Sequence, residues 1–277
     1  MEVLEIAESE ITQLQQIARE LRRKSLELIF NAGSGHPGGS LSAADIVSAL
    51  YFGTMNYDPR NPTDPKRDRF ILSKGHCTAL LYSTLARAGY FAPSHLLEYR
   101  KIDSQLFLSG HPHPKTPGVE IATGSLGQGL SVGHGIALAS KLDNLDYKVY
   151  VLLGDGELQE GQIWETAMTA SHFKTNNLIA IVDFNKVAQD NLTNNLKNLE
   201  PLDERWHSFG WETIRIDGHD MQQIIKAFRT PLDPEKPRVI IANTVKGKGV
   251  SFMENKTEWH GVAPSEKEYQ KALKELE

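Results

Sequence analysis

The pattern of apolar and polar positions predicts a chain in which helices alternate with short strands. Near the N-terminus, apolar residues at helical spacing predict one long amphipathic helix over 11–29 that ends near 31–33. Further along, runs of apolar and β-branched residues occupy 149–153, 178–183, 211–216 and 239–245, and most are separated by helix-length segments. Strands that alternate with helices form parallel sheets, so we expect an α/β fold with helices on both faces of the sheet.

The connecting segments carry signals of their own. Residues 33–40 hold four glycines, after which Ser40 is predicted to cap the next helix. Residues 58–69 and 189–200 are rich in polar residues and turn formers, and we expect both to be surface loops. The charged segment 266–277 predicts an exposed terminal helix.

Composition describes an ordinary globular protein and excludes several functions. The 277 residues are 40% hydrophobic and 23% charged, with a formal net charge of -5. This charge provides no basic surface for a polynucleotide, so we expect no nucleic-acid partner. The longest apolar runs, 149–153 and 178–182, are too short to span a membrane, and the acidic N-terminus is unlike a signal peptide. The single cysteine, Cys77, fits a reducing compartment, and we expect a cytoplasmic protein.

Polar residues follow two neighbouring predicted strands. Gly154-Asp155-Gly156 follows the strand over 149–153, and Asn185 follows the strand over 178–183, after an interval long enough for a helix and a return strand. Adjacent parallel strands would bring both side-chain oxygens to the same edge of the sheet. Hard oxygen ligands there suit Mg²⁺, and glycine turns present backbone amides to anions. The tripeptide alone is as compatible with a tight turn, but with Asn185 it favours a site for a metal ion and an anion.

These residues resemble a known signature. Gly-Asp-Gly before a helix, with an Asn after the next strand, resembles the thiamine diphosphate binding signature, and GDGELQEG at 154–161 resembles its transketolase form. Other segments resemble transketolase sequence blocks in family order: 34–38, 72–76, 110–112 with 123–129, and 244–249 with 260–261. The resemblance covers nearly the whole chain. It departs from the general signature at Phe184, where another Asn is frequent, and it assigns no role to His113.

The resemblance implies a cofactor and a metal ion. Transketolases hold the diphosphate of thiamine diphosphate through Mg²⁺, for which Ca²⁺ or Mn²⁺ can substitute. The corresponding metal ligands here would be Asp155, Asn185 and the backbone carbonyl of Val187. Gly156 would let the backbone approach the diphosphate, where no Cβ fits. The implied cofactor-binding residues are His76, Gly124, Ser125, Leu126, Gly154, Asp155, Gly156, Asn185 and His260.

Four of the ten histidines lie in the matching segments. His36, His76, His111 and His260 resemble the histidines that line the transketolase channel and contact the diphosphate, the sugar hydroxyl groups and the reacting carbonyl. An imidazole donates, accepts or transfers a proton near neutral pH, so His36, His111 and His260 are implied to be catalytic. Five other histidines lack such support and are expected to be structural: His95, His134, His172, His207 and His219.

Two further residues lie close to these motifs. Glu160 resembles the family glutamate that reaches the subunit interface near the cofactor, and we include it among the catalytic residues. A carboxylate at this place also suits the first turn of a helix. Cys77 follows His76 directly, but we do not expect a nucleophile there, because the cofactor would supply one and no third residue orients a Cys-His pair.

The resemblance further implies a two-chain enzyme. We expect residues 1–277 to form a single pyrophosphate-binding domain, with the pyrimidine-binding and C-terminal domains on a partner chain. This C-terminal subunit would supply the catalytic glutamate, and a homodimer contact is expected within an α2β2 heterotetramer. The implied reaction moves a two-carbon ketol unit from a ketose phosphate, such as xylulose 5-phosphate, to ribose 5-phosphate or erythrose 4-phosphate. Such a transferase belongs to the pentose phosphate pathway.

Other functions remain open at this point. The chain could belong to a related two-chain thiamine diphosphate enzyme, such as another ketol-acceptor synthase, or be the α-subunit of a 2-oxo acid dehydrogenase. A non-catalytic family member is disfavoured because Asp155, Asn185 and the four channel histidines are present. A nicotinamide dehydrogenase is disfavoured because no Gly-x-Gly-x-x-Gly follows an early strand.

Overall fold

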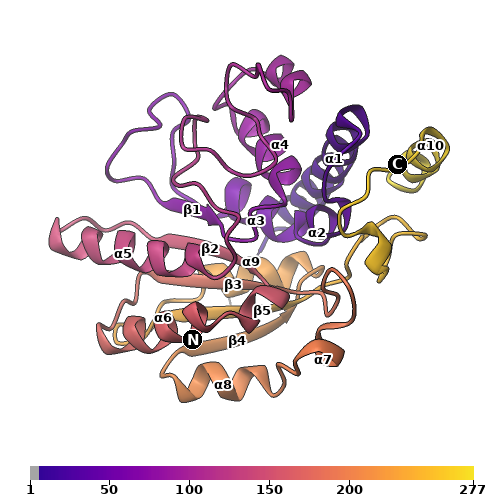
Figure 1. The fold of residues 1–277 in the computed structure, drawn as a ribbon. Coiled ribbons are helices and arrows are strands. Elements are labelled where there is room, and N and C mark those ends of the chain that lie inside the picture. The colour runs from indigo at the N-terminus through magenta and orange to yellow at the C-terminus, as the bar shows by residue number, and fades with distance from the viewer. Residues whose placement is uncertain (1–5) are drawn as a thin grey trace.

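The computed structural model describes residues 6–277 and consists of a five-stranded sheet between two layers of helices (Figure 1). The strands are β1 (Arg69–Leu72), β2 (Val149–Gly154), β3 (Leu178–Phe184), β4 (Glu212–Asp217) and β5 (Arg238–Asn243). The α-helices are α1 (Glu8–Ala32), α2 (Pro37–Ser42), α3 (Ala44–Gly53), α4 (Thr78–Ala88), α5 (Gln128–Leu142), α6 (Gly161–His172), α7 (Thr193–Leu196), α8 (Leu202–Ser208), α9 (Met221–Arg229) and α10 (Glu266–Glu275). Short 3₁₀ helices η1 (Pro93–Glu98), η2 (Gly156–Gln159) and η3 (Thr257–Trp259) complete the elements.

All paired strands run parallel, in the order β1-β2-β3-β5-β4. This confirms the predicted α/β class and the four predicted strands, although β5 ends at Asn243 and not at 245. The prediction missed β1, whose first residue, Arg69, had been included in the loop over 58–69. A four-residue strand that begins with a charged side chain gives little periodic signal.

Each face of the sheet has its own helical layer and apolar core. Helices α1, α3, α4 and α9 cover one face, and their core includes Leu50, Leu85 and Ile224. Helices α5, α6 and α8 cover the other face, where Val151, Ile163 and Trp206 pack together. The central strands are therefore buried on both sides, which explains why β2 and β3 read as continuous apolar runs.

The glycine-rich segment after α1 differs in detail from its prediction. Gly33 ends α1 in the left-handed conformation, with φ 60°, and its amide donates to Phe30 O, as a helix C-cap requires. The next helix begins at Pro37 and not after Ser40, so the predicted capping role of Ser40 is wrong. Ser40 instead lies inside α2 and donates its hydroxyl to His36 O. The early start of α2 places His36 at its N-cap.

The remaining segments surround this core. Within residues 6–277, no helix is both long enough and apolar enough to cross a membrane. The predicted terminal helix is present as α10, which begins with a capping box at Ser265 and Glu268. Ala272 of α10 and the C-cap residue Leu276 pack against Leu26 of α1 in a small third core.

Candidate active site

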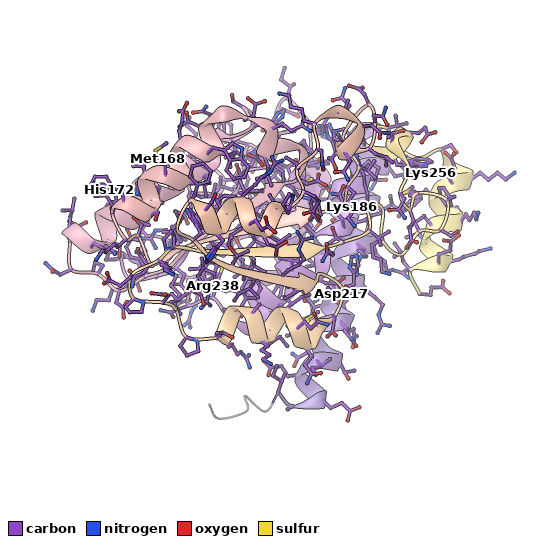
Figure 2. All side chains as sticks on the ribbon, turned by 90° about the horizontal axis from the view of Figure 1, so that it is seen from below. Met168, His172, Lys186, Asp217, Arg238 and Lys256 are labelled. Atoms are coloured by element: carbon purple, nitrogen blue, oxygen red, sulfur yellow. The ribbon has the colours of Figure 1, made fainter. Side chains whose placement is uncertain are left out.

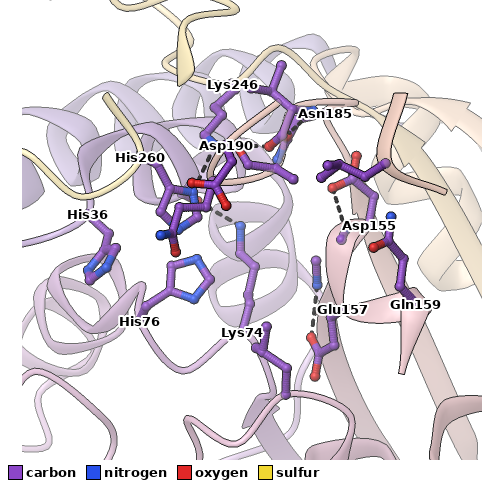
Figure 3. Close-up of a pocket in the computed structure, with 18 of the residues that line it drawn as sticks. His36, Lys74, His76, Asp155, Glu157, Gln159, Asn185, Asp190, Lys246 and His260 are labelled. Carbon is purple, nitrogen blue, oxygen red and sulfur yellow. Dashed lines mark hydrogen bonds between the residues drawn. The ribbon is translucent and has the colours of Figure 1, made fainter. Parts of the chain in front are cut away.

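A polar pocket lies where β2 and β3 end side by side, with Gly154 paired to Asp183 (Figure 3). Its volume is about 330 Å³. Ten of the residues singled out in the sequence line it: His36, His76, Gly124, Leu126, Gly154, Asp155, Gly156, Asn185, Val187 and His260. Six separate segments of the chain thus converge at the carboxyl edge of the sheet, where parallel α/β proteins bind ligands.

Three of the sequence-derived candidates do not line this pocket. His111 is exposed but lies against Gly124, where an added Cβ would come within 2.6 Å of the imidazole ring. Ser125 is exposed beside the pocket residues Gly124 and Leu126. Glu160 is also exposed, and it packs against Gly127, the N-cap residue of α5.

Asp155 is a buried carboxylate at the N-terminus of η2. Its oxygens accept hydrogen bonds from the amides of Gly156, at 2.7 Å, and Lys186, at 2.5 Å. Burial, followed by the nearby charge of Asp183, raises the pKa of Asp155 to about 7. A cation placed beside this carboxylate would offset both effects.

Asn185 and Val187 present further oxygen atoms on the loop after β3. Asn185 donates its side-chain amide to Asp183 Oδ2, at 3.1 Å, and accepts from the amide of Val187, also at 3.1 Å. These two bonds decide which end of the Asn185 amide is the oxygen. The carbonyl of Val187 accepts from Lys246 Nζ at 2.9 Å and retains a second lone pair.

Asp183 is the centre of this network and was not recognised in the sequence. The side chain has no exposed surface and lies within the otherwise apolar strand β3. Besides Asn185, it accepts from Lys74 Nζ at 2.5 Å, from Ser42 Oγ at 2.6 Å and from Thr244 Oγ1. A lone charged residue in a buried strand was the available signal, because such a charge needs partners.

Two lysines form a cationic wall that the sequence reasoning also missed, although both lie in the matching segments. Lys74 and Lys246 are each 1% exposed and line the pocket. Burial would lower the pKa of Lys74, but Asp183 raises it above its usual value, so Lys74 is cationic near neutral pH. Burial lowers the pKa of Lys246 to about 8, and its ammonium group lies 2.9 Å from His260 Nδ1. Two buried ammonium groups facing one cavity are the chemistry of an anion site.

Three histidines gather beside the two lysines, on the side of the pocket opposite Asp155 (Figure 3). The ring centroids of His36, His76 and His260 are 5.0–5.5 Å apart. Burial, and then neighbouring cationic groups, lowers the pKa of His36 to about 4 and that of His260 to about 3. The pKa of His76 is also well below its usual value, for the same reasons. All three are neutral near pH 7 and can each donate and accept one hydrogen bond.

Glu157 links two of the segments that line the pocket. It is 2% exposed, and its carboxylate accepts from Ser73 Oγ and from the amides of Gly127, at 2.9 Å, and Gly154, at 3.1 Å. Burial raises its pKa above the usual value. This side chain ties the end of β2 to the turn before α5 that carries Leu126.

The pocket residues fit a metal-bound diphosphate. The donors at Asp155, Asn185 and Val187 are all oxygen atoms, which suit Mg²⁺, Ca²⁺ or Mn²⁺. Among residues 6–277, no three His, Cys, Asp or Glu side chains come together as a metal cage, so a cation here would need oxygen atoms from a ligand. Within the same part of the chain, His36 Nδ1 is buried without a hydrogen-bond partner, as expected of a group that meets a ligand.

Comparisons with known proteins identify this type of site. The family model described as "Transketolase, thiamine diphosphate binding domain" matches residues 13–276. The chain therefore belongs to the transketolase family, and the matched domain is the one that binds thiamine diphosphate. A crystal structure of transketolase from Campylobacter jejuni superposes with a TM-score of 0.88 at 36% sequence identity, covering 95% of this chain and 43% of that one.

The relatives fall into two size classes. An apulose-4-phosphate transketolase subunit from Phocaeicola vulgatus is 41% identical over 271 residues, which cover 96% of this chain and 95% of that protein. The 6-deoxy-6-sulfo-D-fructose transketolase subunit SqwG from Clostridium sp. is 43% identical over 95% of this chain and 96% of that protein. Human transketolase is 44% identical over 90% of this chain, but the match spans only 39% of its own length.

Proposed function

We propose that this chain is the N-terminal, pyrophosphate-binding subunit of a two-chain transketolase and forms a single domain over residues 1–277. The observation that carries the proposal is the pocket in which three oxygen donors, two buried lysines and three neutral histidines converge. The reaction would be the transfer of a two-carbon ketol unit from a ketose phosphate to an aldose phosphate. Family membership argues against the α-subunit of a 2-oxo acid dehydrogenase and against a nicotinamide dehydrogenase.

The binding roles follow from the chemistry of each wall. Asp155, Asn185 and the carbonyl of Val187 would hold Mg²⁺, and the ammonium groups of Lys74 and Lys246 would face the diphosphate. His76, Gly124, Ser125 and Leu126 would contact the rest of the cofactor, with Gly154 and Gly156 giving its phosphates access to the backbone. When bound, thiamine diphosphate supplies the carbon nucleophile that carries the two-carbon unit.

The catalytic roles depend on neutral imidazoles. His36 and His260 have lowered pKa values of about 4 and about 3, so each can donate one hydrogen bond to a sugar oxygen and accept another. His111 lies beside Gly124 at the exposed rim, where an entering sugar phosphate would pass. We propose that these three histidines orient the substrate and move protons between its hydroxyl and carbonyl oxygens.

The partner chain would cover an apolar surface on α5 and α6. Residues 121–140 contain no Asp, Glu, Lys or Arg, yet Val132 and Leu142 of α5 are 39% and 83% exposed. On the adjacent helix α6, Met168 is 59% exposed, and it lies at the periphery of the molecule (Figure 2). A helix that is apolar on both faces is typical of a buried one, which supports a further chain at this place.

The apolar surface on α5 and α6 supports a complex of more than one chain. We propose that a C-terminal subunit supplies the pyrimidine-binding domain and the catalytic glutamate, and that two such pairs form an α2β2 heterotetramer. Glu160, exposed beside the N-terminus of α5, would lie near the contact between the two halves. The buried Cys77 fits a reducing compartment, and we place the complex in the cytoplasm.

The sugar specificity is the finest part of the proposal. We expect xylulose 5-phosphate as donor and ribose 5-phosphate or erythrose 4-phosphate as acceptor, as in the pentose phosphate pathway. The two relatives of similar length are named for apulose 4-phosphate and 6-deoxy-6-sulfo-D-fructose, so these sugars are the competing donors.

The test is an assay of ketol transfer by this chain, by a candidate C-terminal subunit, and by their mixture. Thiamine diphosphate, Mg²⁺ and each of the three donors are supplied in turn. Activity that appears only in the mixture is the expected result, and the donor with the highest kcat/KM identifies the substrate. Full activity of this chain alone would contradict the two-chain proposal.

A further inference from the structure

A line of hydrogen bonds connects α1 to the pocket lysine Lys246 through a histidine outside the pocket. Arg22 of α1 donates both terminal nitrogens to Asp45 of α3, at 3.1 and 2.5 Å. His219, on the turn between β4 and α9, lies with Nδ1 2.8 Å from Asp45 Oδ2. The backbone amide of Val245, the residue before Lys246, donates to His219 Nε2 at 2.8 Å.

The directions of these bonds define the state of the imidazole. Burial would raise the pKa of Asp45, but the Arg22 guanidinium and the hydrogen bond from His219 hold it below its usual value, so Asp45 is an ionised acceptor. His219 must then donate from Nδ1 and accept at Nε2, which is the neutral form with its proton on Nδ1. The same side-chain pattern, a carboxylate that orients a histidine, fixes the tautomer in many functional sites.

The segment that His219 contacts, residues 244–247, contributes Lys246 to the wall of the pocket. Thr244 donates to Asp183, and the amide of Gly247 donates to Gly38 O at 3.0 Å. Between these anchors, Lys246 extends its ammonium group to the carbonyls of Val187 and Ala188, at 2.9 Å each. The bond from Val245 to His219 therefore fixes the backbone at the residue directly before Lys246.

We propose that His219 is a positioning residue for the cofactor site. Oriented by Asp45, its neutral imidazole holds the amide of Val245 and thereby aims Lys246 at the bound diphosphate. The inference rests on the proposed function in one respect, namely that Lys246 faces a diphosphate. It assigns a role to one of the histidines that the sequence left as structural.

A purely structural role would give a different result from a positioning role. If His219 only tethers the turn after β4 to α3, its removal lowers the stability of the chain whether or not Lys246 is present. If it positions Lys246, its removal weakens cofactor binding only while the ammonium group is there. A double-mutant cycle separates these two cases.

The experiment titrates thiamine diphosphate with Mg²⁺ into the 277-residue chain by calorimetry, first alone and then mixed with the C-terminal subunit. The proteins are the wild type, His219→Ala, His219→Gln, His219→Asn, Lys246→Ala and the double variant His219→Ala/Lys246→Ala. His207→Ala on α8, an exposed histidine, is the matched control. Thermal unfolding of each protein sets a temperature at which all of them are folded.

We expect Lys246→Ala to weaken binding by about tenfold to a hundredfold, because a charged hydrogen-bond donor is lost. His219→Ala should weaken binding by about tenfold, and the double variant should bind no more weakly than Lys246→Ala. Gln reaches far enough to accept from Val245, whereas Asn does not, so His219→Gln should restore affinity and His219→Asn should not. The control should bind like the wild type.

Three results would overturn the inference. Additive losses of affinity in the double variant, or equal affinities of the Gln and Asn variants, would show that His219 does not act through Lys246, while wild-type binding leaves the proposed function intact. A wild-type chain that binds no thiamine diphosphate, either alone or mixed with its C-terminal subunit, would overturn the proposed cofactor site, and the role of His219 with it. If His219→Ala does not fold, the comparison of His219→Gln with His219→Asn decides.

Discussion

Buried charged side chains at the two ends of the same sheet differ in how completely the protein neutralises them. At the amino end, Arg238 is 1% exposed and uses its whole guanidinium: Nε and Nη2 donate to Glu212, and the terminal nitrogens donate to the carbonyls of Ala227, Thr230 and Pro231. Figure 2 shows Arg238 at this end and Lys186 and Asp217 at the other. At the carboxyl end, the pKa of Asp155 rises to about 7 and that of Lys246 falls to about 8.

This difference teaches how to tell a structural buried charge from a functional one. The charge at the amino end is neutralised by the protein itself, so that end needs nothing further. The carboxyl end keeps a carboxylate, a lysine and an unpaired histidine nitrogen in an environment that the protein alone does not balance. Such imbalance is typical of sites that a ligand completes.

The largest expected effect is at Asp155. Asp155→Ala should reduce thiamine diphosphate affinity in the presence of Mg²⁺ by more than about a hundredfold, because a metal ligand is lost where even outer-shell changes cost about tenfold or more. Calorimetry on the chain, and ketol transfer by its mixture with the partner, measure this loss. Unchanged affinity would contradict the assignment of Asp155 as a metal ligand.

A pair of matched substitutions tests the comparison of the two ends directly. Asp183→Asn leaves the buried Lys74 ammonium without its counter-ion and should lower the free energy of unfolding by about 3 kcal/mol. Glu212→Gln does the same to Arg238 at the amino end, where Glu212 is partly exposed, and should cost about 1–3 kcal/mol.

Only one member of this pair should affect the cofactor. Asp183 also orients Asn185, so Asp183→Asn should weaken thiamine diphosphate binding by about tenfold, whereas Glu212→Gln should leave it unchanged. Denaturant unfolding gives the stabilities and calorimetry gives the affinities. Equal effects of both substitutions on affinity would remove the distinction between the two ends.

The apolar surface on α5 and α6 gives a smaller effect. Met168→Glu places a charge on this surface and should weaken association with the C-terminal subunit by about tenfold, with little change in the unfolding temperature of the isolated chain. Gln222→Glu, an exposed change on α9 at the other face of the sheet, is the control. Equal affinities of both variants for the partner, measured by analytical ultracentrifugation, would place the contact elsewhere.

The smallest effect concerns pH. The lowered pKa values of His36 and His260 mean that the unfolded chain binds protons before the folded chain does, so these residues reduce stability as the pH falls from about 6.5 toward 4. Replacing both by Gln should flatten the decline in unfolding free energy over this interval, compared with the wild type. His207→Gln, at an exposed position, should leave the decline unchanged.

Much of the fold could be predicted because its signals are local. Runs of apolar residues specify buried parallel strands, and the spacing of polar residues after β2 and β3 specifies the edge at which they meet. The short strand β1 and the start of α2 could not be predicted in the same way, since tertiary packing determines both. The segment 189–200 lies at the surface, as expected, but nothing in the sequence showed that its residues Gln189, Asp190 and Leu196 also line the pocket.

The site residues that lie in local sequence motifs could be predicted. Those that belong to a hydrogen-bond network between distant segments could not. Asp155 and Asn185 stand out beside glycines and strand ends. Asp183, Glu157 and His219 act through partners that are distant in the sequence, such as Ser42, Ser73 and Asp45. A single sequence gives no register between such segments, and only the folded chain shows which groups satisfy one another.

The exposed apolar residues on α5 and α6 have a consequence for how the protein is made. A chain synthesised without its partner would present Val132, Leu142 and Met168 to water, to other copies and to the proteases that remove unassembled subunits. The cell would gain most from this protein when both halves of the enzyme are translated in equal amounts and at the same time. This surface would then be exposed only in chains that have not assembled and buried in those that have.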